Sequence, residues 1–227
     1  MKYKIHKLLY VLLAFLLLVD IGDVSAQITH TADGNVDKQA DALLSRAAGV
    51  FKKQAMSFRV TMINQPAPNV KSSSKTSKLS ADVLYSSGCY RVTLPDMVLY
   101  CDGKSVWQWD KKANEVNVNP LSDSQDDLMN PASLLANYKK NFRAKYIRQE
   151  DNGDAVIDLI PKKSKSYHKI RLVLASKSAT IKSMTLHNYD GSRGQYQVGG
   201  IKKVKCVASD FAFNAAANPS VEIIDMR

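Results

Sequence analysis

The sequence predicts a mainly β protein with two or three helices, whose strands form a single curved or barrel-like antiparallel sheet. Three observations support this fold class. Apolar and polar residues alternate in about ten short segments, which is typical of half-buried strands. Only two segments have apolar residues at the three- and four-residue spacing that is typical of an amphipathic helix. Asp102-Gly103, Asn152-Gly153 and Asp190-Gly191 stand between apolar runs, where hairpin turns need residues that tolerate a positive φ.

The first 26 residues predict a cleavable signal peptide. Three lysines precede an apolar run over residues 8–19, and a polar stretch ends at Ala26. A transmembrane anchor is the alternative, but this run is shorter than the roughly 20 residues that span a bilayer. A lipid anchor would need a cysteine at the cleavage point, and the first cysteine is Cys89. We therefore expect cleavage after Ala26 and a mature protein in solution outside the cytoplasm.

The net charge favours some partners over others. Removal of residues 1–26 takes away three lysines and two aspartates, so the charge falls from +11 to +10. Such an excess favours anionic membrane surfaces or acidic partners. Nucleic acid is not expected, because an exported chain meets little of it and no RNP-type stacking motif is present. We expect a monomer with one sizeable core.

Residues 27–37 predict a flexible lead-in, and residues 38–227 predict a single domain. The domain begins with an amphipathic helix, for which Asp37 is the expected N-cap. Its apolar positions are Ala40, Leu43, Leu44, Ala47, Val50 and Phe51. A second, short helix is predicted after Asn130-Pro131, because proline suits the first turn of a helix.

Strands with one apolar and one polar face are predicted at residues 58–62, 79–85 and 90–94. The segment 69–78, rich in serine and lysine, predicts a mobile loop between the first two. Further strands are predicted at residues 106–109, 115–118, 155–160, 170–174, 181–187, 196–198, 211–213 and 221–224.

The three cysteines exclude a disulfide framework of the small secreted type, because their number is odd. Cys89 and Cys101 flank a Pro95-Asp96 turn, and two strands folded back there would lie side by side. A disulfide between Cys89 and Cys101 is one interpretation. Three small, buried hydrophobic residues are the other, because cysteine is among the most buried residue types.

No motif predicts catalysis, a metal or a cofactor. His30, His168 and His187 are the histidines of the expected mature chain, and none has a second ligand at metal-site spacing. The nucleophile elbow, the phosphate-binding glycine loop and the Cys-x-x-Cys motif are all missing from the sequence. The acidic pairs Asp126-Asp127 and Glu150-Asp151 are typical of solvated surface rather than of a glycosidase. We therefore do not expect an enzyme.

The unusual feature of the sequence is apolar. Trp107 and Trp109 share one face of a strand, and two short helices offer little surface to fill the concave side of a curved sheet. Either the sheet closes tightly around an ordinary core, or it leaves a pocket for an apolar ligand. The candidate wall of that pocket comprises Phe58, Val60, Met62, Val83, Tyr90, Val92, Trp107, Trp109, Val116 and Val118.

From about Ala40 to Arg227 the chain resembles the LolA-type outer-membrane lipoprotein carrier family. Residues 101–110 are similar to the family's segment of Asp-Gly-Lys, small apolar residues, Trp, x, Tyr and Asp. The remaining similar pieces, in the family's order, are Ser57-Phe58, Tyr90-Arg91, Asn130-Pro131 with Leu134-Leu135, residues 158–162, residues 211–213 and residues 221–227. One departure is that Ser86-Ser87 stand where the family often has a basic residue and proline before its aromatic-Arg pair.

The resemblance implies an unclosed antiparallel β half-barrel of the LolA/LolB type, with a helical lid over an apolar cavity for acyl chains. Leu134 and Leu135 would lie on that lid. It further implies a periplasmic carrier of acylated lipoproteins, which receives them from an inner-membrane donor transporter and delivers them to an outer-membrane acceptor. Three other functions remain open: a carrier of free lipid or glycolipid, an envelope-sensing half-barrel, and a secreted hydrolase.

Overall fold

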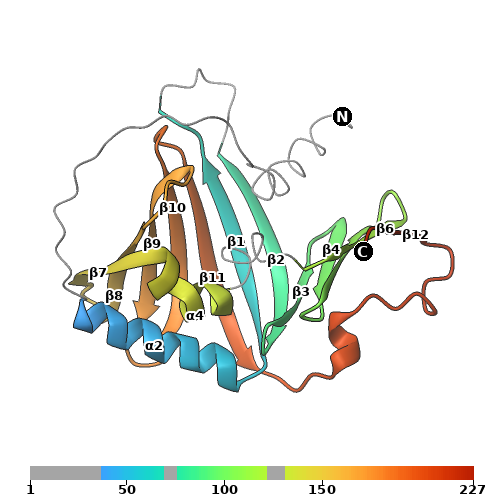
Figure 1. Ribbon diagram of the computed structural model, residues 1–227, viewed down its shortest axis with the longest axis horizontal. Coiled ribbons are helices and arrows are strands. Elements are labelled where there is room, and N and C mark those ends of the chain that lie inside the picture. Colours follow the sequence, from blue (N-terminus) through green and yellow to red (C-terminus); the bar gives the residue numbers. More distant parts are fainter. Residues whose placement is uncertain (1–36, 69–75, 122–130) are drawn as a thin grey trace. The chain divides into compact units, whose positions relative to one another are not determined.

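One open sheet of twelve strands is the framework of the residues described by this computed structural model, 37–68, 76–121 and 131–227 (Figure 1). Its order is β12-β6-β5-β4-β3-β2-β1-β11-β10-β9-β8-β7. The strands are β1 (Met56–Gln65), β2 (Ser77–Ser86), β3 (Cys89–Thr93), β4 (Met97–Cys101), β5 (Ser105–Asp110), β6 (Glu115–Pro120), β7 (Phe142–Gln149), β8 (Asp154–Pro161), β9 (Tyr167–Ala175), β10 (Thr180–Asn188), β11 (Arg193–Lys203) and β12 (Glu222–Asp225). The predicted mainly β, unclosed fold is confirmed.

Several predictions fall outside the described residues. They are the signal peptide, most of the lead-in, the Asp126-Asp127 pair and residues 69–75 of the predicted loop. Ser77 and Lys78, which were assigned to that loop, instead begin β2.

Two helices pack on one face of the sheet. In α2 (Lys38–Lys53) the predicted N-cap is confirmed, because the Asp37 carboxylate accepts a hydrogen bond of 3.0 Å from the Ala40 amide. As the sequence predicts, α4 (Pro131–Asn141) begins at its proline. The helices contact each other, and both contact β7, while α2 also reaches β10 (Figure 1). No helix in the described part of the chain is long and apolar enough to cross a bilayer.

The strand predictions need three corrections. The predicted strand at residues 211–213 is wrong: a short 3-10 helix, η1 (Ala208–Phe211), stands there, and the Asp210 carboxylate accepts a 2.9 Å hydrogen bond from the Val207 amide. β4 and β7 are additional to the predicted strands. The apolar residues of β4 do not alternate with polar ones, because both faces of that strand are covered. Finally, β12 pairs parallel with β6, whereas an antiparallel sheet was expected.

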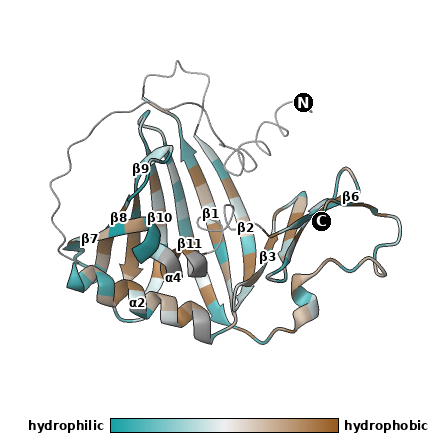
Figure 2. Cartoon of the chain, in the orientation of Figure 1, coloured by the Kyte–Doolittle hydropathy of each residue, from teal (hydrophilic) through white to brown (hydrophobic). Residues whose placement is uncertain are grey.

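The two faces of the sheet are defined here by the residues of β1. The inner face carries Met56, Phe58, Val60 and Met62, and the outer face carries the residues between them. Figure 2 shows the resulting alternation of hydrophobic and hydrophilic positions along β1 and β2. The helices cover the inner face of β8 to β10. The core beneath them includes Leu44, Ile157, Leu159, Ile170, Leu172, Leu174 and Leu186, all at most 1% exposed.

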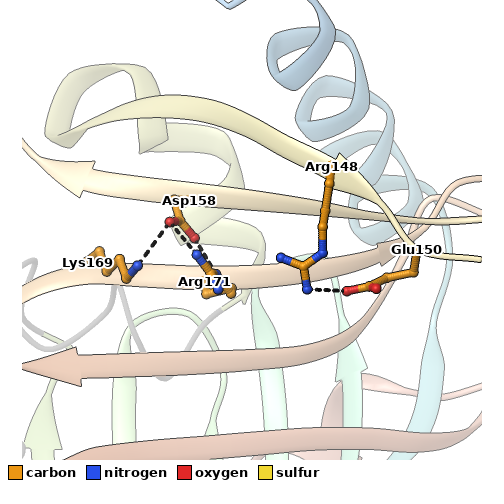
Figure 3. A network of polar contacts seen from close by, with 5 residues as sticks. All are labelled: Arg148, Glu150, Asp158, Lys169 and Arg171. Carbon is orange, nitrogen blue, oxygen red and sulfur yellow. Dashed lines mark hydrogen bonds and ion pairs between the residues drawn. The ribbon is translucent and has the colours of Figure 1, made fainter.

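The outer face of β8 and β9 holds a buried carboxylate between two cations (Figure 3). Asp158 accepts hydrogen bonds of 2.7 and 2.9 Å from the Arg171 guanidinium and one of 3.2 Å from the Lys169 ammonium. The Asp158 side chain is only 8% exposed. Burial raises the pKa of this carboxyl, but the hydrogen bonds from Arg171 and Lys169 lower it by more, so its pKa lies below the usual value.

We expect Asp158→Asn to lower the thermal midpoint at pH 7 by roughly 10 °C, because breaking a buried ion pair leaves two cations without their partner. A carboxyl whose pKa is lower in the folded protein than in the unfolded chain stabilises the fold when it is ionised. This stabilisation is complete above the pKa of the unfolded chain, about 3.9, and is lost as the pH falls through the pKa of the folded protein. The difference between the variant and the parent should therefore shrink below about pH 4 in scanning calorimetry. The control is Asp82→Asn, which removes the exposed Arg59–Asp82 pair and should change the midpoint little. A gap that does not shrink as the pH falls below about 4 would contradict this account.

Candidate functional site

The helices leave part of the inner face half-buried. Ile170 and Leu172 lie beneath them with 0% exposure, whereas the strands further along the sheet keep apolar side chains partly open. We call this second set the open wall. The open wall consists of Val60 and Met62 of β1, Val83 of β2, Val92 of β3, Met184 of β10, and Tyr196 and Val198 of β11.

Strand register brings the residues of the open wall together. Val83 lies opposite Phe58 on one side and Val92 on the other. Tyr196 lies opposite Met62 on one side and Met184 on the other. Paired residues project from the same face of a sheet, with Cβ atoms about 5 Å apart. The open wall is therefore a continuous apolar surface across five strands.

A cavity of about 720 Å³ lies against β1, β2 and β11, within the roughly 300–1,000 Å³ typical of small-molecule sites. Phe58, Val83 and Val198 contribute to its lining, but most of the lining belongs to the outer face: Ser57, Arg59, Thr61, Asp82, Gln197 and Lys202. The β1–β11 register shifts here, and Gly200 adopts a φ of 63°, a conformation that favours glycine. This bulge, which adds a residue to β11, lies at the cavity.

Tyr196 gives the open wall one polar group. Burial among apolar neighbours raises the pKa of its phenol to about 12, so the hydroxyl stays protonated at neutral pH. No hydrogen-bond partner for this hydroxyl occurs within the described ranges. A ligand over the open wall would meet one hydroxyl in an otherwise apolar surface.

The structure divides the predicted wall. Phe58, Val60, Met62, Val83, Tyr90 and Val92 share the inner face. Trp107, Trp109, Val116 and Val118 do not, and their placement on the same wall is wrong. Val92 pairs with Leu99, Leu99 with Gln108, and Gln108 with Asn117, so the even-numbered residues of β5 continue the inner face. The tryptophans project from the outer face.

The C-terminal part of the chain contacts these outer-face residues. The Phe213 ring lies 5.4 Å from the Trp109 ring and 6.3 Å from the Tyr100 ring, between centroids, in edge-on geometry. Nearby, the Arg91 guanidinium donates a 3.4 Å hydrogen bond to the Asp210 carbonyl. The outer-face aromatics are thus part of the protein's own packing.

Met184, Tyr196 and Val198 belong to the open wall but were not among the predicted site residues. Their strands were predicted, and their alternation with polar neighbours was visible in the sequence. Only the pairing of β1 with β11, between segments far apart in the chain, reveals that they continue the face of Val60 and Met62.

Leu134 and Leu135 lie on α4 and are 1% exposed, within the main core cluster. Polar contacts also hold the helices in place. The Asp41 carboxylate accepts hydrogen bonds from the Tyr138 hydroxyl and from the Lys139 ammonium, which joins α2 to α4. The Arg46 guanidinium donates to the Ser176 and Lys177 carbonyls, at 3.1 and 3.2 Å. The Asp37 carboxylate accepts a 2.7 Å hydrogen bond from the Tyr146 amide of β7.

These contacts do not involve Ser86-Ser87, the pair at which the sequence departs from the family's pattern. Ser86 ends β2 and Ser87 lies in the β2–β3 turn with a φ of 48°.

The hydrogen bonds from the Tyr138 hydroxyl and then from Lys139 lower the pKa of the Asp41 carboxyl. Asp41 is therefore ionised at neutral pH, and its contact with α4 is charge-assisted.

The structure has no disulfide between Cys89 and Cys101, which contradicts the first interpretation of these cysteines. Tyr90 lies opposite Cys101, so Cys101 shares the inner face with Tyr90 while Cys89 projects from the outer face.

Across the described ranges, no three His, Cys, Asp or Glu side chains are grouped to hold a metal ion. His187 is neutral at pH 7, because burial, and then the charges of Lys169 and Arg193, lower its pKa to about 4.

Comparison with known protein families identifies a match over the second half of the chain. The model of the family described as "Outer membrane lipoprotein carrier protein LolA" matches residues 92–214, which is more than half of the chain. None of the curated proteins compared with the chain matches its sequence.

Several solved structures are similar in fold. An uncharacterised conserved protein from Thermus thermophilus has a TM-score of 0.56 and 12% identity, over 82% of this chain and 99% of that one. A LolA superfamily protein from Nitrosomonas europaea has a TM-score of 0.43 and 13% identity, over 77% and 97%. The lipoprotein LppX from Mycobacterium tuberculosis has a TM-score of 0.42 and 12% identity, over 75% and 99%.

Proposed function

Because this chain belongs to the LolA family of outer membrane lipoprotein carrier proteins, we propose that it is a periplasmic carrier that shields the acyl chains of lipoproteins. It would receive them from a donor transporter at the inner membrane and pass them to an acceptor at the outer membrane. The open wall is the single observation that carries the proposal. It is an apolar surface across five strands that the protein's own helices leave half-buried.

The energetics of an acyl chain explain why such a surface is needed. A chain of about sixteen carbons exposes some fifteen methylenes, and each costs roughly 0.8 kcal/mol in water. The total of about 12 kcal/mol per chain prevents free diffusion between membranes. A carrier must offset most of this cost and still release its cargo. Half-buried apolar side chains suit the binding of an acyl chain, because covering them removes further apolar surface from water and makes the binding free energy more favourable.

The helices would act as a lid. In the described state α2 and α4 use their apolar faces to cover the inner face of β8 to β10. A shift of either helix would expose more of the inner face next to the open wall. Contacts between the helix and the sheet would then be replaced by contacts between the sheet and a ligand. Polar contacts at Asp37, Asp41 and Arg46 fasten the closed arrangement.

The test is uptake of a fluorescent palmitoylated peptide by the purified protein, with the same peptide lacking the acyl chain as control. We expect saturable binding of the acylated peptide only. Native mass spectrometry of protein from its own host then identifies the natural cargo. Acylated protein would support the lipoprotein carrier, and loose lipid or glycolipid would favour the alternative carrier. Equal binding of the two peptides would overturn the proposal.

Loosening the lid should strengthen ligand binding. Asp41→Asn removes the charge that joins α2 to α4, so we expect the thermal midpoint to fall by roughly 2–4 °C. If the closed lid competes with the ligand, the substitution should also favour binding. Destabilising the closed state by about 1 kcal/mol relative to the open state raises the apparent affinity for acylated peptide about fivefold. Calorimetry and peptide titration measure the two effects.

The control is Asp96→Asn, which breaks the exposed Lys112–Asp96 pair between the β3–β4 turn and the β5–β6 turn. It should leave the affinity unchanged. If Asp41→Asn binds the peptide more weakly than the parent does, the lid does not compete with the ligand.

A further inference from the structure

We propose that Cys89 and Cys206 form a disulfide that ties the segment after β11 to the β2–β3 turn on the outer face of the sheet. This bond would fix the C-terminal part of the chain over β3. It differs from the cysteine pairing suggested by the sequence, and it does not depend on lipid binding.

The path of the chain places Cys206 beside that turn. Beyond the end of β11, the Val204 amide donates a 3.1 Å hydrogen bond to the Ala55 carbonyl. Ala55 immediately precedes β1, where Met56 pairs with Tyr85 near the end of β2. The turn that follows β2 leads directly to Cys89. Two residues after Val204, the chain therefore passes the start of β3.

A second contact fixes the direction of the segment. Arg91 pairs with Asp210 through a 3.4 Å hydrogen bond to its carbonyl and a 4.0 Å approach to its carboxylate. Cys89 and Arg91 are two residues apart on β3, so both project from the outer face. The segment from Cys206 to Asp210 thus follows the same face of β3. Burial, then the charge of Asp102, and then that of Cys206 raise the pKa of the Cys89 thiol, which is consistent with two neighbouring thiols.

Exposure distinguishes this pair from the third cysteine. Cys89 and Cys206 are both half-buried, and an oxidant can reach them. Cys101 is 0% exposed and projects into the core of the inner face. It is neither accessible nor on the correct face.

The reaction needs an oxidant of the disulfide class, such as oxidised glutathione. One thiolate attacks the glutathione disulfide, forms a mixed disulfide and releases one reduced glutathione. The second cysteine attacks the mixed disulfide, forms the S–S bond and releases another. The two cysteines lose two electrons and two protons, which the glutathione disulfide takes up. Because exchange requires the thiolate and the pKa of Cys89 is raised, the rate should increase with pH.

The experiment treats the reduced, purified protein with oxidised glutathione at about pH 8.5, then blocks the remaining thiols with N-ethylmaleimide. Trypsin places each cysteine on a separate peptide, at residues 79–91, 92–104 and 206–227. We expect mass spectrometry to find the first and third peptides joined and the second blocked. Oxidation should raise the thermal midpoint by roughly 10 °C, because the bond closes a long loop.

Single variants locate the bond. Cys89→Ser and Cys206→Ser should each abolish the joined peptide and the rise in midpoint, whereas Cys101→Ala is the matched control and should keep both. The parent protein alone is sufficient if a variant does not fold. Three blocked thiols, glutathione retained on Cys89 or Cys206, or a link through Cys101 would overturn the proposal, whatever the result of the lipid-binding test.

Discussion

Val83→Glu is expected to weaken binding of an acylated peptide more than a hundredfold while the protein stays folded. Val83 lies between Phe58 and Val92 in the open wall. An acyl chain over this position would remove the new carboxylate from water, at a cost of at least about 3 kcal/mol, which corresponds to more than a hundredfold in Kd. In the free protein the half-buried position leaves the carboxylate partly hydrated.

The next residue provides a matched control. Leu84 is also apolar and half-buried on β2, but it projects from the outer face opposite Arg91. Leu84→Glu introduces the same charge on the same strand, next to a cation. We expect its Kd to stay within about twofold of the parent in the same titration. If both variants lose binding equally, or if Val83→Glu binds like the parent, the open wall is not the acyl-chain site.

Local sequence patterns predicted most of the fold. The spacing of Ala40, Leu44, Ala47 and Phe51 defined α2, and all four are buried. The hairpin turns were also predictable, because Gly103, Gly153 and Gly191 adopt φ values of 88°, 83° and 84° where the sequence places glycine after Asp or Asn. These features depend on residues that are close together in the chain, where composition and periodicity are informative.

The predicted wall residues on β1 to β3 do share one face of the sheet, because apolar and polar residues largely alternate along these strands. The tryptophans were misplaced because apolar character does not specify which face is covered. On β5 the outer face holds Trp107 and Trp109, and its cover comes from Phe213, more than a hundred residues later in the chain. Counting residues through the short turns from Tyr90 to Trp109 would have assigned the correct face.

The edges and contacts between distant segments were the least predictable. β7 is an edge strand with exposed Arg143, Lys145 and Arg148, so its apolar content is low. The contact of Arg46 with the β9–β10 turn joins residues that are far apart in sequence, and no local pattern indicates it. Such contacts arise from packing, which a single sequence does not encode locally.

Leu134→Glu should destabilise the packing of α4 on the sheet and not only alter ligand contact. Leu134 is 1% exposed and belongs to the same core cluster as Leu44 and Leu172. A carboxylate there must either be buried without a partner or force α4 away from the sheet, and truncation of the leucine alone would cost about 2–5 kcal/mol. We expect the thermal midpoint to fall by more than roughly 10 °C, measured by circular dichroism.

The comparison with Lys140→Glu separates this effect from a general effect of charge. Lys140 lies on the same helix but is exposed, so the variant should melt within about 2 °C of the parent. If the lid is held mainly by its apolar face, Leu134→Glu should also expose the inner face and bind the hydrophobic dye ANS, whereas Lys140→Glu should not. A folded Leu134→Glu protein with an unchanged midpoint would mean that α4 is anchored by its polar contacts with Asp41, and that its leucines contribute little to lid closure.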